Sequence, residues 1–496
     1  DAATTSNLTG NLNVSSGTLP ATGALNASVM NLSGGTVNGA GKVTVSTDFN
    51  QTGGSFAPTG SIDLTRTLGN LSFGAFSTSG TIRLATTGAN DVVIAGDLTA
   101  TNAGLLPTDA AIAIASGRDV RLNAVNVTAS GTGGIRIDAA RNFDAVATDI
   151  CCGAGFVRGL SAPGDVAITA TAGSIARTAD DLLNVSGRNL AFTAGTSFGP
   201  IGNLTATGSL AVDAATTLST SGVSASAANG VAFTAGGALS TSSVTTTSGA
   251  IALTSTAASI ATGTLSAGTD VTLTAATGIT AGTLTGGTAG HGVITLANSG
   301  ATSDIVLTGN VTTTASGLAD TAAAITIDSH RDLFVNAVNL TTTGSGAIRL
   351  NATGTINLMA ADICCGAGFT RSLDAAGNVL ITGTTLTRSA DDLMQVQGNA
   401  VSLITSGNIG PVGDLTARTG NLFVQAGPGA GNTIDFSGRT LTASAGDISL
   451  LAGGNIAVTR VTAPGGVITG TSTAGSYTAG ALQDARAITL SAANGL

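Results

Sequence analysis

Several residue types are missing from this chain of 496 residues, and their absence excludes whole classes of structure. Glutamate and tryptophan do not occur, Lys42 is the only lysine, and Tyr477 is the only tyrosine. Glu, Lys and Gln usually cover the exposed faces of helices, because they keep side-chain freedom there. The chain is rich instead in Gly, Thr, Ser, Val and Ala, which suit strands and turns. The composition therefore predicts an all-β protein.

Charge and long apolar runs are also scarce. Only 9% of the residues are charged, and the net charge is −9. No basic stripe with interleaved aromatic residues is present, so we expect no nucleic-acid partner. No uninterrupted apolar segment of about 18 residues occurs, so we expect no membrane-spanning helix. A hydrophobic content of 43% argues against a disordered chain.

A short repeat of about 20 residues runs through the sequence. Each repeat contains two apolar residues separated by one position, which places both side chains on one face of a strand. Such pairs recur at Val43/Val45, Ile62/Leu64, Ile82/Leu84, Leu210/Val212, Val231/Phe233, Ile251/Leu253, Val271/Leu273, Ile448/Leu450 and Ile488/Leu490. One unit of this length cannot bury its own apolar face, but stacked coils can bury it between them. The repeat therefore predicts a parallel β-solenoid of roughly 22 coils, with Gly-rich corners.

A longer repeat is superimposed on the short one. The segment TDICCGAGFVRGLSAPGDVAIT, which begins at Thr148, returns as ADICCGAGFTRSLDAAGNVLIT from Ala361. Cys151 matches Cys364 at an offset of about 213 residues. We expect one continuous solenoid that contains a partial repeat at 1–79, a full large repeat at 80–291 and a second, incomplete one at 292–496.

The spacing of the apolar pairs widens twice within each large repeat. Because the cross-section fixes the length of a coil, the extra residues are expected to project outward as loops. These loops are predicted within 85–110 and 148–165 in the first copy, and within 298–323 and 361–378 in the second. Loops on a rigid scaffold commonly carry recognition, and the candidate binding residues in them are Phe156, Arg158, Phe369 and Arg371.

The strand starts resemble those of a known family. Segments such as GDISLLA and GNLFVQA follow a Gly–Asn/Asp–apolar–x–apolar pattern, and GSLAVDA follows it with Ser in the second place. This pattern and the coil length resemble the shafts of secreted bacterial adhesins of the filamentous haemagglutinin type, which are exported by two-partner secretion. The resemblance covers essentially the whole chain. It implies a right-handed β-helix at the bacterial cell surface or in a secreted fibre.

The paired cysteines are the least common chemistry in the chain. Cys151–Cys152 and Cys364–Cys365 are expected to lie about ten coils, or ~48 Å, apart, which is too far for a disulfide between the pairs. Three interpretations remain open. Each pair forms a vicinal disulfide, or bonds to a neighbouring chain, or stays as free thiols or metal ligands. The structural interpretation, which we favour, is a locally closed loop that packs Phe156 or Phe369 over the shaft.

Other polar residues give only weak signals of catalysis. Asp180–Asp181 and Asp391–Asp392 each follow an arginine, Arg177 or Arg388. Adjacent residues of a strand point to opposite faces, so such pairs make poor catalytic dyads. We expect solvated turns with Arg–Asp contacts instead. His291 and His330 lie at no metal-ligand spacing. We therefore predict no catalytic residues, no metal site and no cofactor.

The composition, the repeats and the duplicated loops are compatible with three functions. The first is a structural extracellular fibre or adhesin shaft, whose partners are copies of itself through end-to-end or lateral contacts. The second is a module that binds a host or cell-surface glycan, or a receptor, through the duplicated loops. The third is a polysaccharide lyase or hydrolase. Because the unusual features occur twice, the sequence favours length or repeated display over one active site, and we expect no enzyme.

Overall fold

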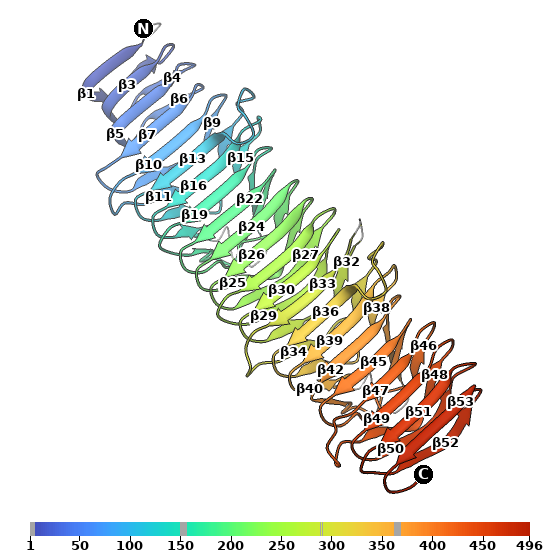
Figure 1. Cartoon of the computed structure of the whole chain (residues 1–496). Helices are drawn as coiled ribbons and strands as arrows, with labels where there is room; N and C mark the ends of the chain where they lie inside the picture. Colours follow the sequence, from blue (N-terminus) through green and yellow to red (C-terminus); the bar gives the residue numbers. More distant parts are fainter. Residues whose placement is uncertain (1–4, 149–155, 288, 290, 362–368) are drawn as a thin grey trace. The chain divides into compact units, whose positions relative to one another are not determined.

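The computed structural model describes residues 5–148, 156–287, 289, 291–361 and 369–496. None of these residues is helical, so the described part of the chain contains no helix that could span a membrane. The strands of successive coils pair in parallel, as the ribbon in Figure 1 shows within each part of the chain. The predicted all-β parallel solenoid is therefore confirmed, with about 22 turns roughly 21 residues apart. The chain forms two compact units, residues 1–243 and residues 244–496.

In the first unit, a typical coil contributes one short strand to each of three parallel sheets. The first sheet contains β1 (Ser6–Val14), β3 (Leu25–Leu32), β5 (Val43–Gln51), β7 (Ile62–Arg66), β10 (Ile82–Thr86), β13 (Ala110–Ser116), β16 (Gly134–Ala139), β19 (Val166–Ala170), β22 (Leu190–Ala194), β24 (Ser209–Ala214) and β26 (Gly230–Ala235). The second contains β8 (Leu71–Phe73), β11 (Val92–Ile94), β14 (Val120–Leu122), β17 (Phe143–Asp144) and β20 (Ile175–Ala176). The third contains β9 (Phe76–Thr78), β12 (Leu98–Ala100), β15 (Val127–Ala129), β18 (Val157–Ser161), β21 (Leu182–Gly187), β23 (Leu204–Ala206) and β25 (Leu218–Ala227). Near the N-terminus, β2 (Thr18–Pro20), β4 (Thr36–Gly39) and β6 (Ser55–Pro58) pair separately.

The second unit repeats this arrangement. Its first sheet contains β28 (Ala250–Ser255), β30 (Val271–Ala275), β33 (Ile294–Asn298), β36 (Ala323–Ser329), β39 (Ala347–Ala352), β42 (Val379–Gly383), β45 (Val401–Thr405), β47 (Leu422–Gln425), β49 (Ile448–Ala452), β51 (Val467–Ser472) and β53 (Ala487–Ala492). The second contains β31 (Ile279–Ala281), β34 (Ile305–Leu307), β37 (Leu333–Val335), β40 (Thr355–Asn357) and β43 (Thr385–Thr387). The third contains β32 (Leu284–Gly286), β35 (Val311–Thr313), β38 (Leu340–Thr342), β41 (Thr370–Asp374), β44 (Leu393–Gly398), β46 (Leu415–Ala417), β48 (Ile434–Ala443), β50 (Ile456–Thr462) and β52 (Tyr477–Gln483). β29 (Ile260–Ser266) pairs with both β31 and β32, and β27 (Leu239–Thr246) precedes β28.

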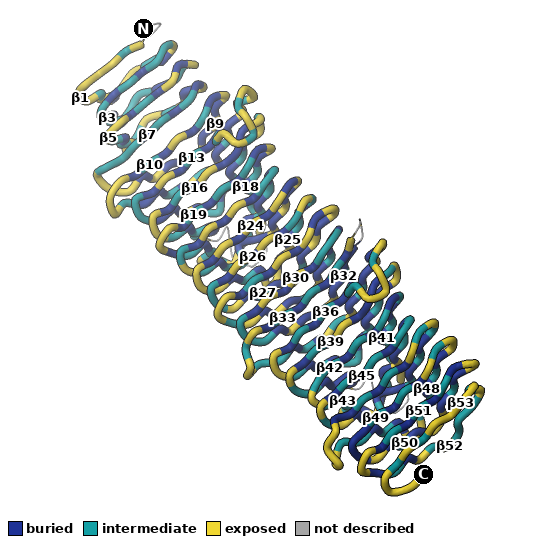
Figure 2. The backbone as a smooth tube through the Cα atoms, viewed as in Figure 1, coloured by how far each residue is buried: buried dark blue, intermediate teal, exposed yellow. Residues whose placement is uncertain are grey.

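The apolar pairs of the sequence form two buried ladders inside each unit. In the first unit, Ile62 pairs in register with Ile82, and Ile82 with Ile112. Leu64 and Leu84 form the parallel ladder two positions further along the strands. All are buried, and the alternation of buried and exposed residues along each strand is visible in Figure 2. Burial of each such side chain stabilises the coil by about 1.5–3 kcal/mol.

The Asn or Asp that precedes a strand has a defined structural role. Its side-chain oxygen accepts the backbone N–H of a residue one coil further on, and we call this bond the Asx contact. In the first unit, Asp119 N donates to Asp91 Oδ1 at 3.2 Å, and Asn142 N donates to Asp119 Oδ1 at 3.1 Å. Coils are ~4.8 Å apart, so a short side chain spans the step. This geometry explains why Asx residues recur at strand starts.

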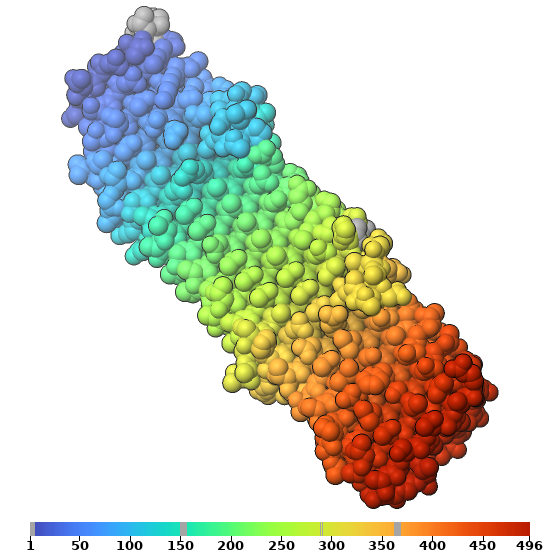
Figure 3. All heavy atoms as spheres, in the orientation of Figure 1, coloured from blue at the N-terminus to red at the C-terminus, as the bar shows by residue number. Residues whose placement is uncertain are grey.

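The loops predicted from the widened spacing are shorter than the sequence suggested. The predicted ranges 85–110 and 298–323 contain β11, β12, β34 and β35, which belong to the sheets. The segments that project are residues 101–109 and 314–322, seen in Figure 3 as light blue and yellow protrusions. The other two predicted ranges likewise contain β18 and β41.

Candidate functional site

The two cysteine pairs whose bonding the sequence left open lie outside the described residues; they are Cys151–Cys152 and Cys364–Cys365. The structure does place the residues that follow them. Phe156 and Phe369 stand at matched positions and are 44% and 45% exposed.

Arg158 and Arg371 lie two residues further on, in β18 and β41. The Nε atoms of both are buried, and neither has a hydrogen-bond partner among the described residues. The expectation that Phe156 or Phe369 packs over the shaft concerns the loop that carries the cysteines, which lies outside the described residues, and stays a prediction.

One aspartate of each acidic pair holds the backbone N–H of the phenylalanine that follows the cysteines in sequence. Asp181 is fully buried, and its carboxylate accepts the backbone N–H of Phe156 at 3.1 Å. In the second copy, the buried Asp392 accepts the N–H of Phe369 at 2.9 Å. A buried carboxylate requires such donors because burial of a charge is otherwise costly. The bond therefore fixes where the chain re-enters the sheet.

The expectation of solvated turns with Arg–Asp contacts is wrong in one respect. Asp181 and Asp392 are buried rather than solvated. Arg177 donates through Nε to the carbonyl of Pro200 at 3.0 Å and through Nη1 to the carbonyl of Asp181 at 3.0 Å. Arg388 makes the equivalent bonds, to the carbonyls of Pro411 at 2.6 Å and Asp392 at 3.1 Å. The guanidinium thus binds backbone carbonyls of the turn.

His291 and His330 are both exposed, and the structure brings neither to a cluster of metal ligands among the described residues. The backbone N–H of His330 donates to Asn298 Oδ1 at 2.9 Å. Asn298, at the end of β33, therefore holds the backbone of His330.

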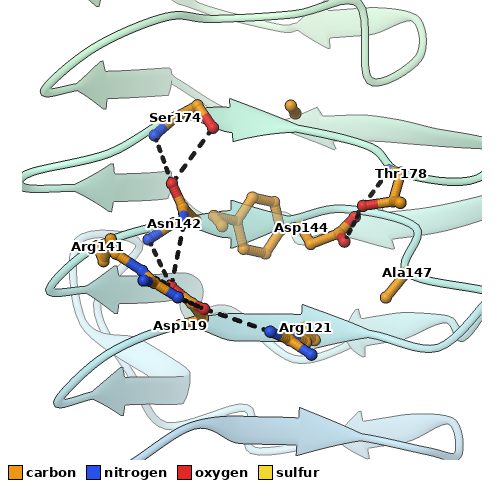
Figure 4. Close-up of a pocket in the computed structure, with 10 residues that line it drawn as sticks. Asp119, Arg121, Arg141, Asn142, Asp144, Ala147, Ser174 and Thr178 are labelled. Carbon is orange, nitrogen blue, oxygen red and sulfur yellow. Dashed lines mark hydrogen bonds and ion pairs between the residues drawn. The ribbon is translucent and has the colours of Figure 1, made fainter. Parts of the chain in front are cut away.

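A polar hollow lies beside β14, β17 and β20 in the first unit. Its volume is about 440 Å³, and Figure 4 shows its two walls. One wall carries Asp119, Arg121 and Arg141, and the other carries Asp144 and Thr178. The hollow also includes Asn142, Phe143, Ala147, Ser174 and Ala176.

Asp119 is the electrostatic centre of the first wall. Arg141 binds it with both arms of the guanidinium, Nε to Oδ1 at 2.9 Å and Nη2 to Oδ2 at 2.6 Å. Arg121 Nη2 approaches Oδ2 at 3.4 Å. The bond from Arg141 is the main cause that lowers the pKa of Asp119 to about 2, against the opposing effect of burial. A carboxylate held ionised in this way does not serve as a general acid near neutral pH.

The second wall is formed by a hydrogen bond between coils. The backbone N–H of Thr178 donates to Asp144 Oδ1 at 3.0 Å, and the Thr178 hydroxyl donates to Oδ2. Asp144 is therefore fixed in orientation. The hollow presents guanidinium donors on one side and a carboxylate acceptor on the other (Figure 4).

The hollow was not found from the sequence. A usable signal was present, since Arg followed by Asp or Asn opens several coils, at Arg118–Asp119, Arg141–Asn142, Arg188–Asn189 and Arg331–Asp332. In each of these coils the arginine pairs with an aspartate one coil earlier.

Comparisons with protein-family models, with curated proteins and with solved structures find no match for this chain.

Proposed function

We propose that this chain is a length of an extracellular bacterial fibre or adhesin shaft, whose coils supply extension and present loops at a fixed pitch. The observation that carries the proposal is the repetition of one coil-to-coil device. Asx contacts occur in both units, for example from Asp119 N to Asp91 and from Asp332 N to Asp304. A device that repeats with the coil adds length without requiring a unique centre.

The resemblance to filamentous haemagglutinin-type shafts supports the same role. The Gly–Asn/Asp–apolar–x–apolar starts that carry the resemblance are the segments that make the Asx contacts, as in Gly446–Asp447, where Val467 N donates to Asp447 Oδ1 at 2.8 Å. Such a shaft would assemble with copies of itself and act outside the cell, without catalysis.

A second candidate function is recognition by the duplicated segments. Phe156 and Phe369 leave exposed rings at matched places, and exposed aromatic residues are frequent anchors in interfaces. A glycan or receptor bound at both places would gain affinity through multivalency.

Immunogold labelling of producing cells with antibodies against this chain tests the shaft proposal. Label along surface filaments or in shed fibres is expected. Label confined to the cell interior contradicts the proposal. A variant with Phe156→Ala and Phe369→Ala separates the second candidate function, because it should bind cells less while its filaments look unchanged.

A further inference from the structure

We propose that the hollow lined by Arg121, Arg141 and Asp144 binds a single uronic-acid residue, that is, a sugar with one carboxylate and several hydroxyl groups. This inference goes beyond the shaft role and does not depend on it. It rests on three observations: the arginines have N–H groups that are not used, Asp119 holds both arginines in place, and the arginines and the Asp144 carboxylate line different sides of the hollow.

The donors on the first wall are only partly used. Arg141 gives Nε and Nη2 to Asp119, and its Nη1 makes no hydrogen bond within the part of the chain that the structure describes. Arg121 uses only Nη2, at the long distance of 3.4 Å. The two side chains are 52% and 45% exposed, so their remaining N–H groups face water at the hollow. Two guanidinium groups side by side match the geometry of a carboxylate.

The arrangement is also pre-organised. Asp119 is 4% exposed and accepts bonds from Arg141, Arg121 and the Asn142 backbone, so the arginines are already held when a ligand arrives. Holding the binding groups before association reduces the entropy lost on binding. Exposed arginines without such a partner would bind an anion less well.

The wall that carries Asp144 disfavours a ligand with several anionic groups. The Asp144 carboxylate would repel a second anionic group but would accept hydrogen bonds from hydroxyls. The local charges also balance, since Asp91, Asp119 and Asp144 face Arg118, Arg121 and Arg141. One carboxylate at the arginines and hydroxyls at Asp144 therefore fit better than a densely sulfated chain. The volume of about 440 Å³ lies in the range of small-ligand sites and admits one or two sugar units.

The second copy of the large repeat lacks this hollow's key groups. The residues that match Arg121, Arg141 and Asp144 are Phe334, Gly354 and Asn357. One site in this chain is therefore expected, rather than one per large repeat.

Titration calorimetry with the full chain tests the inference, using glucuronic acid, its methyl ester and glucose. Saturable binding of glucuronic acid at one site per chain is expected, with no binding of the ester or of glucose. Arg121→Ala should weaken it about 10- to 100-fold, because a charge-assisted bond is lost. Arg136→Ala, which removes an exposed arginine paired with Asp138 at 2.7 Å, is the matched control and should leave binding unchanged.

A second arm distinguishes the source of the sugar. If the site recognises a glucuronate residue inside a polysaccharide, a polymer with internal glucuronate should bind as the free sugar does. Binding of the free sugar alone would assign a terminal residue. Absence of glucuronic acid binding by the wild-type chain, or equal binding by Arg121→Ala in a variant with unchanged circular dichroism, overturns the inference.

Discussion

The two copies of the large repeat agree in some contacts and differ in others. The Asx contact from Asp119 N to Asp91 is matched by the contact from Asp332 N to Asp304. The buried Asp181 is matched by Asp392. Arg141, however, is replaced by Gly354. The copies thus share the bonds that join one coil to the next. Most of the arginines that pair with an aspartate one coil earlier, which we call the arginine layer, belong to the first copy.

One substitution shows what the fold requires. In the first copy, the Thr178 backbone donates to Asp144 Oδ1 at 3.0 Å, and in the second copy Ser389 N donates to Asn357 Oδ1 at 3.2 Å. The charge is lost but the bond between coils remains. A short side chain that carries a carbonyl oxygen is therefore the requirement, and the negative charge is not.

The largest effect is expected where the copies agree. Asp181→Ala and Asp392→Ala should each lower the free energy of unfolding by about 1–3 kcal/mol, because the N–H of Phe156 or Phe369 loses its buried acceptor. Urea unfolding of the full chain measures both. Asp213→Ala, at an exposed position of β24, serves as the control. Effects that differ strongly between the two buried positions would break the equivalence of the copies.

A smaller effect should separate the copies. Asp119 accepts hydrogen bonds from Arg121, Arg141 and Asn142. Asp332 accepts the Thr355 N–H at 2.6 Å, and among the described residues its carboxylate has one arginine close to it in its own coil, Arg331 at 3.4 Å. Asp119→Ala should therefore cost about 1–2 kcal/mol more than Asp332→Ala. Thermal unfolding of the two variants checks the difference, and equal costs would show that the arginine layer adds no stability.

Acid should act first on the region that carries the arginine layer. The pKa of Asp119 is lowered to about 2, and the pKa values of Asp91 and Asp165 are lowered chiefly by hydrogen bonds from Arg118 and Arg188. A lowered pKa means that the stabilisation is complete above the unfolded value of 3.8 and is lost as the pH falls toward about 2. Hydrogen exchange between pH 5 and pH 2 should show faster opening around residues 91–189. Asp119→Asn should flatten this dependence, and an unchanged profile would contradict its cause.

The smallest effect is expected at a surface pair. Arg188 binds Asp165 through Nε at 2.8 Å but is 39% exposed, so solvent screens the interaction. Arg188→Ala should therefore lower the stability less than any of the preceding substitutions. The matching position is Asn399, which donates to Asp320 at 2.9 Å, and Asn399→Ala should cost no more. Urea midpoints for the two variants make the comparison, and a larger loss at Asn399 would reverse it.

The sequence predicted the fold because the solenoid is built from local repetition. The pairs Ile62/Leu64 and Ile82/Leu84 fix both the face and the coil length, and the structure stacks them in register. The hollow could not be predicted in this way. Arg121 and Asp144 are register partners in the paired strands β14 and β17, and Thr178 joins them from the following coil, after an insertion in the chain. Coil register across such insertions is not visible in a single sequence.

The central claim is that short Asx side chains join successive coils wherever they precede a strand, and Asn126 and Asn339 test it most directly. Their Oδ1 atoms accept the N–H groups of Gly159 and Ser372, both at 3.0 Å. The free energy of unfolding should be unchanged by Asn339→Asp, whereas Asn126→Asp should lower it, because the bond from Nδ2 to Asp97 Oδ2 at 3.1 Å is replaced by a contact between two carboxylates. It should fall by about 1 kcal/mol for Asn→Ala and equally for Asn→Gln, whose longer side chain misplaces the acceptor. Wild-type stability of both Gln variants would contradict the claim.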